Sequence, residues 1–325
     1  MGARVVVTFP ADEAQREAIT ATLAPLGRVA YLRDAADEAE RAALLGGAEA
    51  LFAWFPRREL GPADRPALTG VRLIQLLSAG ANQVDFGALP HGAVVASNVG
   101  AYAGPMAEHA LGMTVALTKR LPRNHARLAS GVFDMAPTVR LAGGVAAILG
   151  FGGIGRACAR LLRPLGMRIY AVNTNGRTSE PADFAGTLAD LEQVLPDADV
   201  VIVALPLTRA TRGLIGAREL GWMKPQAVLV NVARGAIVDE DALFEHLKSH
   251  PEFSAGIDAW WEEPGNGKPF HPRLPFLDLP NVLGSPHNSG IVPGAMADAS
   301  AAAAANVAAF LRGEPVHGIQ DPADY

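Results

Sequence analysis

Residues 145–155 read Val145-Ala-Ala-Ile-Leu149-Gly150-Phe-Gly152-Gly153-Ile154-Gly155, an apolar run that passes into a glycine-rich turn. The apolar run predicts a buried strand, the amphipathic stretch Arg156–Leu165 predicts a helix, and Arg168–Val172 predicts a second strand. Between a strand and a helix, a G-x-G-x-x-G turn is typical of dinucleotide binding, because glycine allows a tight turn and lets a pyrophosphate approach the backbone. The helix N-terminus then offers N–H groups and a positive dipole end to the phosphates.

The residues that we expect to bind the dinucleotide through this turn are Gly150, Gly152, Gly153, Ile154 and Gly155. The alternative is a glycine-rich connection between strand and helix that holds no ligand.

The composition describes a folded protein and excludes several classes. The chain has 325 residues, of which 50% are hydrophobic and 19% charged, and its net charge is −5. A disordered chain would be less hydrophobic, and a nucleic-acid binder would carry a basic surface. The single cysteine, Cys158, excludes an internal disulfide framework and a cysteine-built zinc site, and we expect no metal. No leader and no apolar stretch of membrane-spanning length is visible, so we expect a cytoplasmic protein.

Short β-branched runs alternate with helical stretches along the whole chain, which predicts an α/β fold with parallel sheets. The first series of expected strands is Val5–Phe9, Val29–Leu32, Ala50–Phe55, Leu73–Leu77 and Val94–Ser97, with helices at Asp12–Leu23 and Asp37–Leu45. The second series is Val145–Leu149, Arg168–Val172, Val200–Ala204, Val228–Val232, Ser254–Ile257 and Val282–Leu283. Further helices are expected at Met106–Leu121 and, in an alanine-rich run, at Pro293–Leu311.

The residue after the second strand of the dinucleotide unit bears on the choice of cofactor. An Asp or Glu at this point accepts hydrogen bonds from the adenosine ribose of NAD and repels the 2′-phosphate of NADP. This chain has Asn173 there, followed by Thr174 and Arg177. An amide does not repel a phosphate, and an arginine binds one through charge-assisted hydrogen bonds. We therefore expect NADP(H) in preference to NAD(H); the alternative is a solvated loop with an unrelated arginine.

Polar side chains follow three strands of the second series. Arg234 follows Val228–Val232, Glu263 follows Ser254–Ile257 across a short loop, and His287 follows Val282–Leu283. The carboxyl ends of parallel strands meet at one edge of the sheet, where ligands bind. A histidine exchanges protons near neutral pH, a carboxylate orients its ring, and an arginine binds a carboxylate or polarises a carbonyl. Each residue alone is also an ordinary strand-end or loop residue.

Four segments carry a resemblance when taken together and in order. They are Gly150–Gly155, Asn231-Val-Ala-Arg234-Gly235, Asp258-Ala-Trp-Trp-Glu-Glu263-Pro264 and Ser285-Pro-His287-Asn-Ser-Gly290. The chain resembles the D-isomer-specific 2-hydroxyacid dehydrogenases, a family that includes glyoxylate/hydroxypyruvate reductases, phosphoglycerate dehydrogenases and formate dehydrogenase.

The resemblance implies a domain organisation. A Rossmann-type, doubly wound cofactor domain (residues 99–290) is inserted into a discontinuous flavodoxin-like substrate domain (residues 1–98 plus 291–325). It also implies a homodimer, because members of the family usually pair through the cofactor domain.

The resemblance further implies a role for each matching residue. His287 corresponds to the acid/base, Glu263 to the carboxylate that pairs with it, and Arg234 to the residue that holds the substrate's carboxylate and carbonyl. A glutamine in place of Glu263 marks the formate-oxidising branch, so this chain points to a 2-oxo or 2-hydroxy acid. The remaining cofactor residues implied are Leu205, Pro206, Thr211, Val232 and Asp258, the last toward the nicotinamide carboxamide.

The substrate side of the site is expected in the first domain. The turn Ser78-Ala79-Gly80 resembles the family turn whose N–H groups receive the substrate carboxylate. Trp54 either lines the substrate pocket, which would favour a side chain larger than that of glyoxylate, or belongs to the core. Tyr102 either faces the substrate or only packs between the domains. Trp260 and Trp261, beside Glu263, likewise either line the substrate pocket or belong to the core.

The function expected from these features is D-specific hydride transfer between NADPH and a small 2-oxo or 2-hydroxy acid. One alternative is a nucleotide-sensing regulator on the same scaffold with little turnover, which would have no need to keep Arg234, Glu263 and His287 together. A third possibility, an NAD-dependent hydrolase of nucleoside thioethers, fits less well because 325 residues are short for it.

Overall fold

The computed structural model describes residues 3–265 and 267–325, and the chain forms two compact units. The first unit comprises Met1–Tyr102 with Ile291–Tyr325, and the second comprises Ala103–Gly290. The chain leaves the first unit after Tyr102, slightly beyond the expected boundary at residue 98, and returns to it at Ile291. The boundary is later because the side chain of Tyr102 belongs to the apolar core of the first unit.

The first unit is built on a five-stranded parallel sheet with the strand order β2-β1-β3-β4-β5. Its strands are β1 (Ala3–Val7), β2 (Gly27–Tyr31), β3 (Ala50–Ala53), β4 (Leu73–Leu76) and β5 (Val94–Ala96). This is the flavodoxin-like order. Successive strand residues enter opposite apolar clusters, with Phe52 on one face and Leu51 on the other, so both faces of the sheet are buried.

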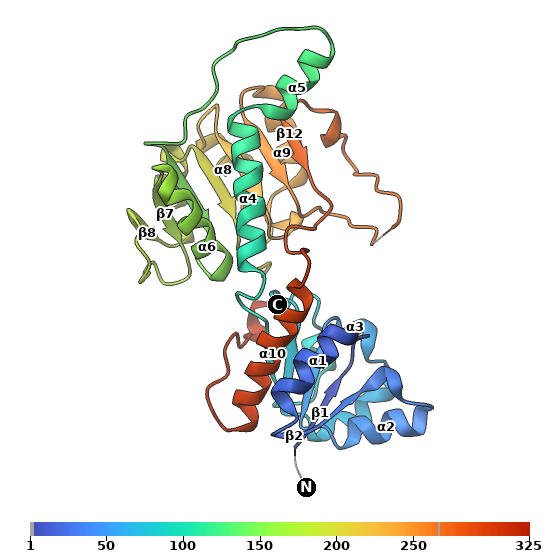
Figure 1. The fold of residues 1–325 in the computed structure, drawn as a ribbon. Helices are drawn as coiled ribbons and strands as arrows, with labels where there is room; N and C mark the ends of the chain where they lie inside the picture. The colour runs from blue at the N-terminus through green and yellow to red at the C-terminus, as the bar shows by residue number, and fades with distance from the viewer. Residues whose placement is uncertain (1–2, 266) are drawn as a thin grey trace. The chain divides into compact units, whose positions relative to one another are not determined.

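The helices of the first unit come from both ends of the chain. They are α1 (Glu13–Leu23), α2 (Glu38–Gly46), α3 (Pro56–Glu59) and α10 (Ala295–Leu311), with 3₁₀ turns at Leu32–Asp34, Pro62–Gly70, Phe86–Ala88 and Pro322–Asp324. Figure 1 shows α10 lying beside α1, and the two helices pack on each other. The small alanine side chains Ala299, Ala303 and Ala304 are completely buried, which lets α10 approach closely.

The second unit is built on a seven-stranded parallel sheet with the order β12-β11-β10-β9-β6-β7-β8. Its strands are β6 (Val145–Leu149), β7 (Arg168–Val172), β8 (Phe184–Gly186), β9 (Val200–Val203), β10 (Val228–Asn231), β11 (Ser254–Ile257) and β12 (Val282–Gly284). Strand order reverses beside β6, as in the Rossmann fold, and the carboxyl ends on both sides of this switch point form a binding edge. The predicted fold class is therefore confirmed. Strand β8 was not predicted, because three residues ending in glycine carry no periodic signal.

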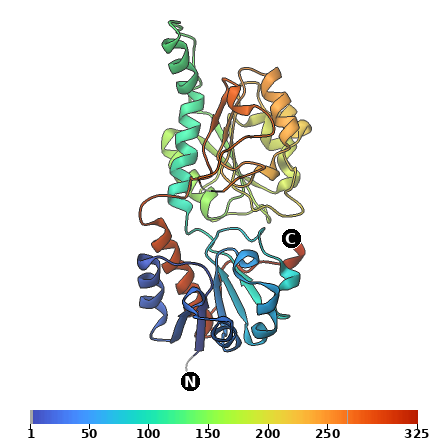
Figure 2. The same cartoon turned by 90° about the vertical axis from the view of Figure 1, so that its right-hand side faces the viewer.

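Helices cover both faces of this sheet (Figure 2). The helices of this unit are α4 (Ala103–Thr118), α5 (Leu121–Ala129), α6 (Gly153–Leu162), α7 (Leu191–Val194), α8 (Ala217–Trp222) and α9 (Glu240–Ser249), of which α5 buries no residue. Additional 3₁₀ turns lie at Arg163–Leu165, Leu188–Asp190, Leu195–Asp197, Gly235–Ile237 and Phe276–Asp278. Helix α4 packs on α6 and on strands β10 and β11. Cys158 is buried inside α6, and burial raises the pKa of its thiol to about 12, so it acts as an apolar residue.

Among the described residues, no helix combines the length and the apolar character needed to cross a membrane. Within the same residues, no group of three or more His, Cys, Asp or Glu side chains gathers as a metal site would require.

Candidate active site

His287 and Glu263 form the centre of the candidate site in the second unit. Nδ1 of His287 lies 2.7 and 2.8 Å from the two carboxylate oxygens of Glu263. The His287 side chain is 33% exposed and that of Glu263 38%, so the pair lies at the surface of this unit. A carboxylate on Nδ1 fixes the proton on that nitrogen and leaves Nε2 to exchange a proton with a substrate.

The backbone of His287 adopts an unusual conformation that Asp258 holds in place. Its φ angle is 51°, in the left-handed region that residues other than glycine rarely occupy. The carbonyl of Asp258 accepts from the N–H of His287 at 2.9 Å, and its carboxylate accepts from the N–H groups of Asn288 at 3.1 Å and Ser289 at 3.3 Å. Consecutive N–H groups thus converge on one buried residue, which offsets the strain and sets the direction of the His287 side chain.

The charge state of Glu263 follows from its surroundings. Partial burial raises the pKa of the Glu263 carboxyl, but the hydrogen bond and positive charge of His287, the N–H of Trp260 and the charge of Arg234 outweigh burial, and the net pKa is lowered. The Trp260 N–H donates to Oε1 of Glu263 at 3.0 Å. Glu263 is therefore ionised at neutral pH and acts as the hydrogen-bond acceptor for Nδ1 of His287.

Arg234 lies just after β10, the strand beside β11, and is half-buried. The side-chain amide of Asn231 donates to the Arg234 carbonyl at 2.9 Å, and the Arg234 guanidinium donates to the Ala233 carbonyl at 2.7 Å. The next residue must be glycine, because a Cβ on Gly235 would lie 2.3 Å from the carbonyl carbon of Trp260. This close approach brings the Arg234 turn against the loop that carries Glu263.

The motifs in the sequence did not reveal a second polar chain, which lies behind His287. Nε2 of His109, on α4, lies 2.9 Å from Oγ of Ser285, and Ser285 donates to Oδ1 of Asp258 at 2.6 Å. The Asp258 side chain is 0% exposed. Sequence reasoning missed His109 and Ser285, since a helix residue and a strand-end serine give no sign of this contact.

The glycine turn has a different steric role at each position. A Cβ on Gly150, where φ is 97°, would lie 2.5 Å from the Ala204 carbonyl, and a Cβ on Gly155 would lie 2.0 Å from the Gly150 carbonyl oxygen. Both glycines are required by packing within the protein. At Gly152, the N-cap of α6, a Cβ would meet no atom within 4 Å. The turn therefore opens at Gly152, where a pyrophosphate would approach, and Gly153 and Ile154 begin the helix.

The loop after β7 is folded by the Asn173 side chain. Its oxygen accepts from the N–H groups of Asn175 at 3.1 Å and Gly176 at 2.8 Å, and its nitrogen donates to the Arg177 carbonyl at 2.7 Å. Thr174 and Arg177 are exposed. Across the described residues the Arg177 guanidinium makes no ion pair, so its charge faces solvent.

Two of the expected cofactor residues have side chains turned inward. Oγ1 of Thr211 donates to the Pro206 carbonyl at 2.7 Å and accepts from the Thr208 N–H at 2.8 Å, which closes the loop after β9. Val232 is completely buried in the apolar cluster beneath α4. Leu205 is half-buried and Pro206 exposed, so these two present surface at the loop.

In the first unit, the turn Ser78-Ala79-Gly80 follows β4. Oγ of Ser78 donates to the Gly80 carbonyl at 2.8 Å and accepts from the Gln83 amide at 2.6 Å. Across residues 3–265 and 267–325, no hydrogen bond uses the N–H groups of Ala79 and Gly80. Half-buried N–H groups of this kind are suited to binding an anion.

The aromatic candidates divide between surface and interior. Trp54 is half-buried and stacks on Phe55 with ring centroids 5.2 Å apart. The hydroxyl of Tyr102 donates to the Leu77 carbonyl at 3.1 Å, and burial raises its pKa to about 12, so Tyr102 supports the turn that begins at Ser78. Trp260 and Trp261 pack on Phe276, and their indole N–H groups donate to backbone carbonyls, which makes both structural.

Comparison with known proteins places the chain in a family. The family model described as D-isomer specific 2-hydroxyacid dehydrogenase, NAD binding domain, matches residues 111–289. The glycerate dehydrogenase of Methylorubrum extorquens is 31% identical over 265 residues, which cover 78% of this chain and 80% of that protein. The chain belongs to the D-isomer-specific 2-hydroxyacid dehydrogenase family.

Other relatives of this chain match over different lengths. The glyoxylate reductase of Thermococcus gammatolerans is 38% identical over 167 residues, which are 51% of this chain and 48% of that protein, so the match spans about half of that relative. A D-isomer specific 2-hydroxyacid dehydrogenase from Xanthobacter autotrophicus Py2, crystallised with NADPH and MES, has a TM-score of 0.79 at 24% identity and covers 99% of each chain. At this identity the likeness shows the shared fold.

The second unit of this chain has features that fit the NAD named in the description of the family model. Gly152 leaves space for a phosphate at the start of α6, which no protein atom fills. The hydroxyl of Ser289, two residues after His287, is buried and has no hydrogen-bond partner among the described residues. An orphaned hydroxyl beside Asp258 is suited to a polar group of a bound molecule.

Proposed function

We propose that this dehydrogenase reduces 2-oxo acids to D-2-hydroxy acids with NADPH. The observation that carries the proposal is the His287–Glu263 pair, held at strand ends beside Arg234 in a domain of dinucleotide-binding fold. When bound, the nicotinamide supplies the hydride to the carbonyl carbon of the substrate, and one proton is consumed.

The proton comes from His287. Its Nδ1 is engaged by Glu263, so Nε2 donates to the carbonyl oxygen as that oxygen gains negative charge. The ionised Glu263 carboxylate accepts from Nδ1 and keeps the ring oriented during the transfer. Arg234 polarises the same carbonyl or binds the adjacent carboxylate through its planar fork. In the reverse direction His287 would accept the proton of a 2-hydroxy acid.

The carboxylate of the substrate is proposed to bind the turn of the first unit. The N–H groups of Ala79 and Gly80 make no other hydrogen bond among the described residues, and Ser78 with Gln83 fixes the turn. The Leu77 carbonyl just before the turn is held by the Tyr102 hydroxyl, which supports a positioning role for Tyr102.

NADPH is proposed as the preferred donor because of the loop after β7. Asn173 adds no negative charge there, and its amide is already bound to the loop backbone. The exposed Arg177 guanidinium and the Thr174 hydroxyl remain to bind a 2′-phosphate. With an acidic residue in place of Asn173, the same loop would repel that phosphate.

The position of Trp54 favours a 2-oxo acid whose side chain is larger than that of glyoxylate. The Glu59 carboxylate accepts from the N–H groups of Trp54 at 3.1 Å and Phe55 at 2.6 Å and from the Thr8 hydroxyl at 2.6 Å, which fixes the Trp54 turn. A rigid, half-buried indole is suited to pack against an apolar or aromatic side chain of a 2-oxo acid.

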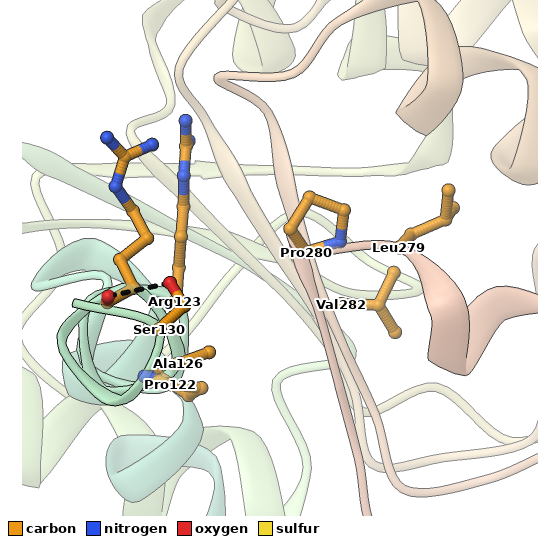
Figure 3. A pocket seen from close by; sticks show the side chains of 8 residues that line it. Pro122, Arg123, Ala126, Ser130, Leu279, Pro280 and Val282 are labelled. Atoms are coloured by element: carbon orange, nitrogen blue, oxygen red, sulfur yellow. Dashed lines mark hydrogen bonds between the residues drawn. The ribbon is translucent and has the colours of Figure 1, made fainter. Parts of the chain in front are cut away.

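A homodimer through the second unit is proposed from the exposed apolar residues around α5. Phe133 is 81% exposed and Met135 86% exposed, and no residue of α5 is buried. Figure 3 shows the face of α5 with Pro122 and Ala126 turned toward Leu279 and Val282, across a groove of about 480 Å³. A second copy of this chain would cover these apolar surfaces.

A reductase panel tests the proposed function. Purified protein is mixed with glyoxylate, hydroxypyruvate, pyruvate or phenylpyruvate, each with NADPH and with NADH, and absorbance at 340 nm is followed. We expect reduction, with NADPH better than NADH and phenylpyruvate better than glyoxylate; chiral chromatography of the product should give the D isomer. Binding of NADPH without oxidation by any 2-oxo acid would instead support a nucleotide-sensing regulator.

A further inference from the structure

A polar chain that ends on the buried Asp258 runs from α4 to the loop that carries His287. It consists of His109, Ser285 and Asp258, joined by the 2.9 Å contact between Nε2 of His109 and Oγ of Ser285 and by the 2.6 Å hydrogen bond from Ser285 to Asp258. Nε2 of His109 also lies 3.7 Å from Oδ1 of Asp258. None of these contacts is part of the proton transfer described above.

The direction of the hydrogen bonds follows from the number of protons. Ser285 has one hydroxyl proton, and the carboxylate of Asp258 can only accept, so the Ser285 proton lies on the 2.6 Å bond. The Ser285 oxygen must therefore accept from His109, which fixes a proton on Nε2 of His109. Ser285 is not an activated nucleophile, because its proton faces a carboxylate and its partner histidine donates.

Asp258 connects this chain to His287. Its Oδ1 accepts from both Ser285 and the Asn288 N–H, its Oδ2 accepts from the Ser289 N–H, and its carbonyl accepts from the His287 N–H. A carboxylate that is 0% exposed depends on these donors, since no water replaces a lost one without cost. Without Ser285, Oδ1 would keep only the 3.1 Å bond from the Asn288 N–H, so the carboxylate would be held less firmly and the left-handed turn at His287 would lose part of its support.

We propose that His109 and Ser285 are positioning residues, which orient the Asp258 carboxylate and thereby hold His287 against Glu263. The proposal rests on the proposed function in that His287 is taken as the proton donor. It predicts that the hydroxyl of residue 285 and a donor at residue 109 matter for turnover although neither contacts the reacting atoms.

The experiment compares variants that remove a group with variants that retain it. Ser285→Ala and His109→Phe remove the hydroxyl and the donor, whereas Ser285→Thr and His109→Gln retain them. Ser254→Ala, a buried serine on β11, is the matched control. We expect kcat for 2-oxo acid reduction to fall about ten- to hundred-fold in the removing variants, and to stay within about threefold of wild type in the retaining variants and the control.

A second measurement does not depend on turnover. In protein labelled with ¹⁵N-histidine, the Nδ1–H proton bonded to Glu263 gives a downfield NMR signal, identified by its absence in His287→Ala. We expect this signal to broaden or vanish in Ser285→Ala and to persist in Ser285→Thr and Ser254→Ala. If Ser285→Ala does not fold, His109→Phe tests the other member of the chain: we expect the signal to broaden in His109→Phe and to persist in His109→Gln.

Failure of the positioning role can be distinguished from failure of the proposed function. An unchanged His287 signal together with unchanged kcat in Ser285→Ala and His109→Phe would overturn the positioning role. A wild-type protein that reduces no 2-oxo acid would overturn the proposed function, and the NMR signal would still decide whether Ser285 and His109 position His287.

Discussion

Nδ1 of His287 lies 2.7 Å and 2.8 Å from the two carboxylate oxygens of Glu263. Glu263 follows β11 and His287 follows β12, two strands that pair in parallel, so the sheet itself brings these residues to one edge. Because the carboxylate occupies Nδ1, the ring is fixed and its second nitrogen is the one that can exchange a proton with a ligand. The consequences of this pairing can be measured.

Replacement of His287 by alanine removes the proposed proton donor. We expect kcat for 2-oxo acid reduction to fall by about 10²–10⁴, the range for loss of a general acid. Steady-state rates with NADPH at saturating substrate measure the change. Binding of NADPH, followed by its fluorescence, should stay within about threefold of wild type, because the glycine turn lies elsewhere on the sheet. Wild-type turnover in this variant would remove His287 from the mechanism.

Glu263 makes the stability of the fold depend on pH. Its pKa in the folded chain is lower than its ordinary value of 4.5, so the ionised carboxylate contributes stability above pH 4.5, and this contribution is lost as the pH falls through the lowered pKa. We expect the melting temperature of wild type to exceed that of Glu263→Gln near pH 7, and the difference to shrink as the pH is lowered below 4.5.

Thermal melts of both proteins across this pH range measure the difference, and Glu262→Gln is the matched control because Glu262 is the exposed neighbour of Glu263. A difference that grows on acidification would show that the Glu263–His287 contact is not stabilising.

Two glycines of the turn are needed for different reasons: Gly155 for packing within the protein, and Gly152 for the approach of a ligand. An added methyl group at Gly152 meets no protein atom, whereas at Gly155 it would lie 2.0 Å from a carbonyl oxygen. We expect Gly152→Ala to melt near the wild-type temperature but to bind NADPH more than about tenfold more weakly, and Gly155→Ala to lose more than about 2 kcal/mol of stability. Calorimetry and fluorescence titration give the two quantities. Tight NADPH binding by Gly152→Ala would show that the phosphate lies elsewhere.

The sequence predicted the fold well because periodic apolar runs and turn glycines are local signals. The βαβ unit around Gly150–Gly155 and the order of strands after it were expected from such runs. Local signals failed at α5, because Pro122 at its start interrupts the helical pattern of α4 and none of its residues is fully buried within this chain.

The site was predictable where chemistry-bearing residues end strands, as Arg234, Glu263 and His287 do. It was not predictable where contacts depend on packing. His109 contacts Ser285 only because α4 packs on β11. The side chains of Thr211 and Asn173 are hydrogen-bonded to backbone carbonyls, and residue type alone could not predict this.

The proposed preference for NADPH depends on one exposed guanidinium, that of Arg177. Replacement of Arg177 by alanine removes the proposed partner of the 2′-phosphate, and a charge-assisted hydrogen bond of this kind contributes about 1.5–3 kcal/mol. We expect KM for NADPH to rise at least about tenfold, while KM for NADH changes less than about twofold. Arg65→Ala, another exposed arginine but on the first unit, is the control and should change neither. Equal effects on both cofactors would show that Arg177 does not discriminate between them.

The proposed dimer depends on apolar side chains that this chain does not bury. Phe133 follows α5 in an extended segment that is almost entirely exposed, and a benzyl group in water costs roughly 2 kcal/mol relative to burial. We expect wild type to elute with twice the mass of the chain in size-exclusion chromatography with light scattering, and Phe133→Asp to shift toward the monomer because burying an unpaired carboxylate is unfavourable. Ile319→Asp, at an exposed apolar position on the first unit, is the control for a general effect of added charge. If wild type is monomeric at micromolar concentration, the dimer proposal fails; if Phe133→Asp remains dimeric, the interface lies on another surface.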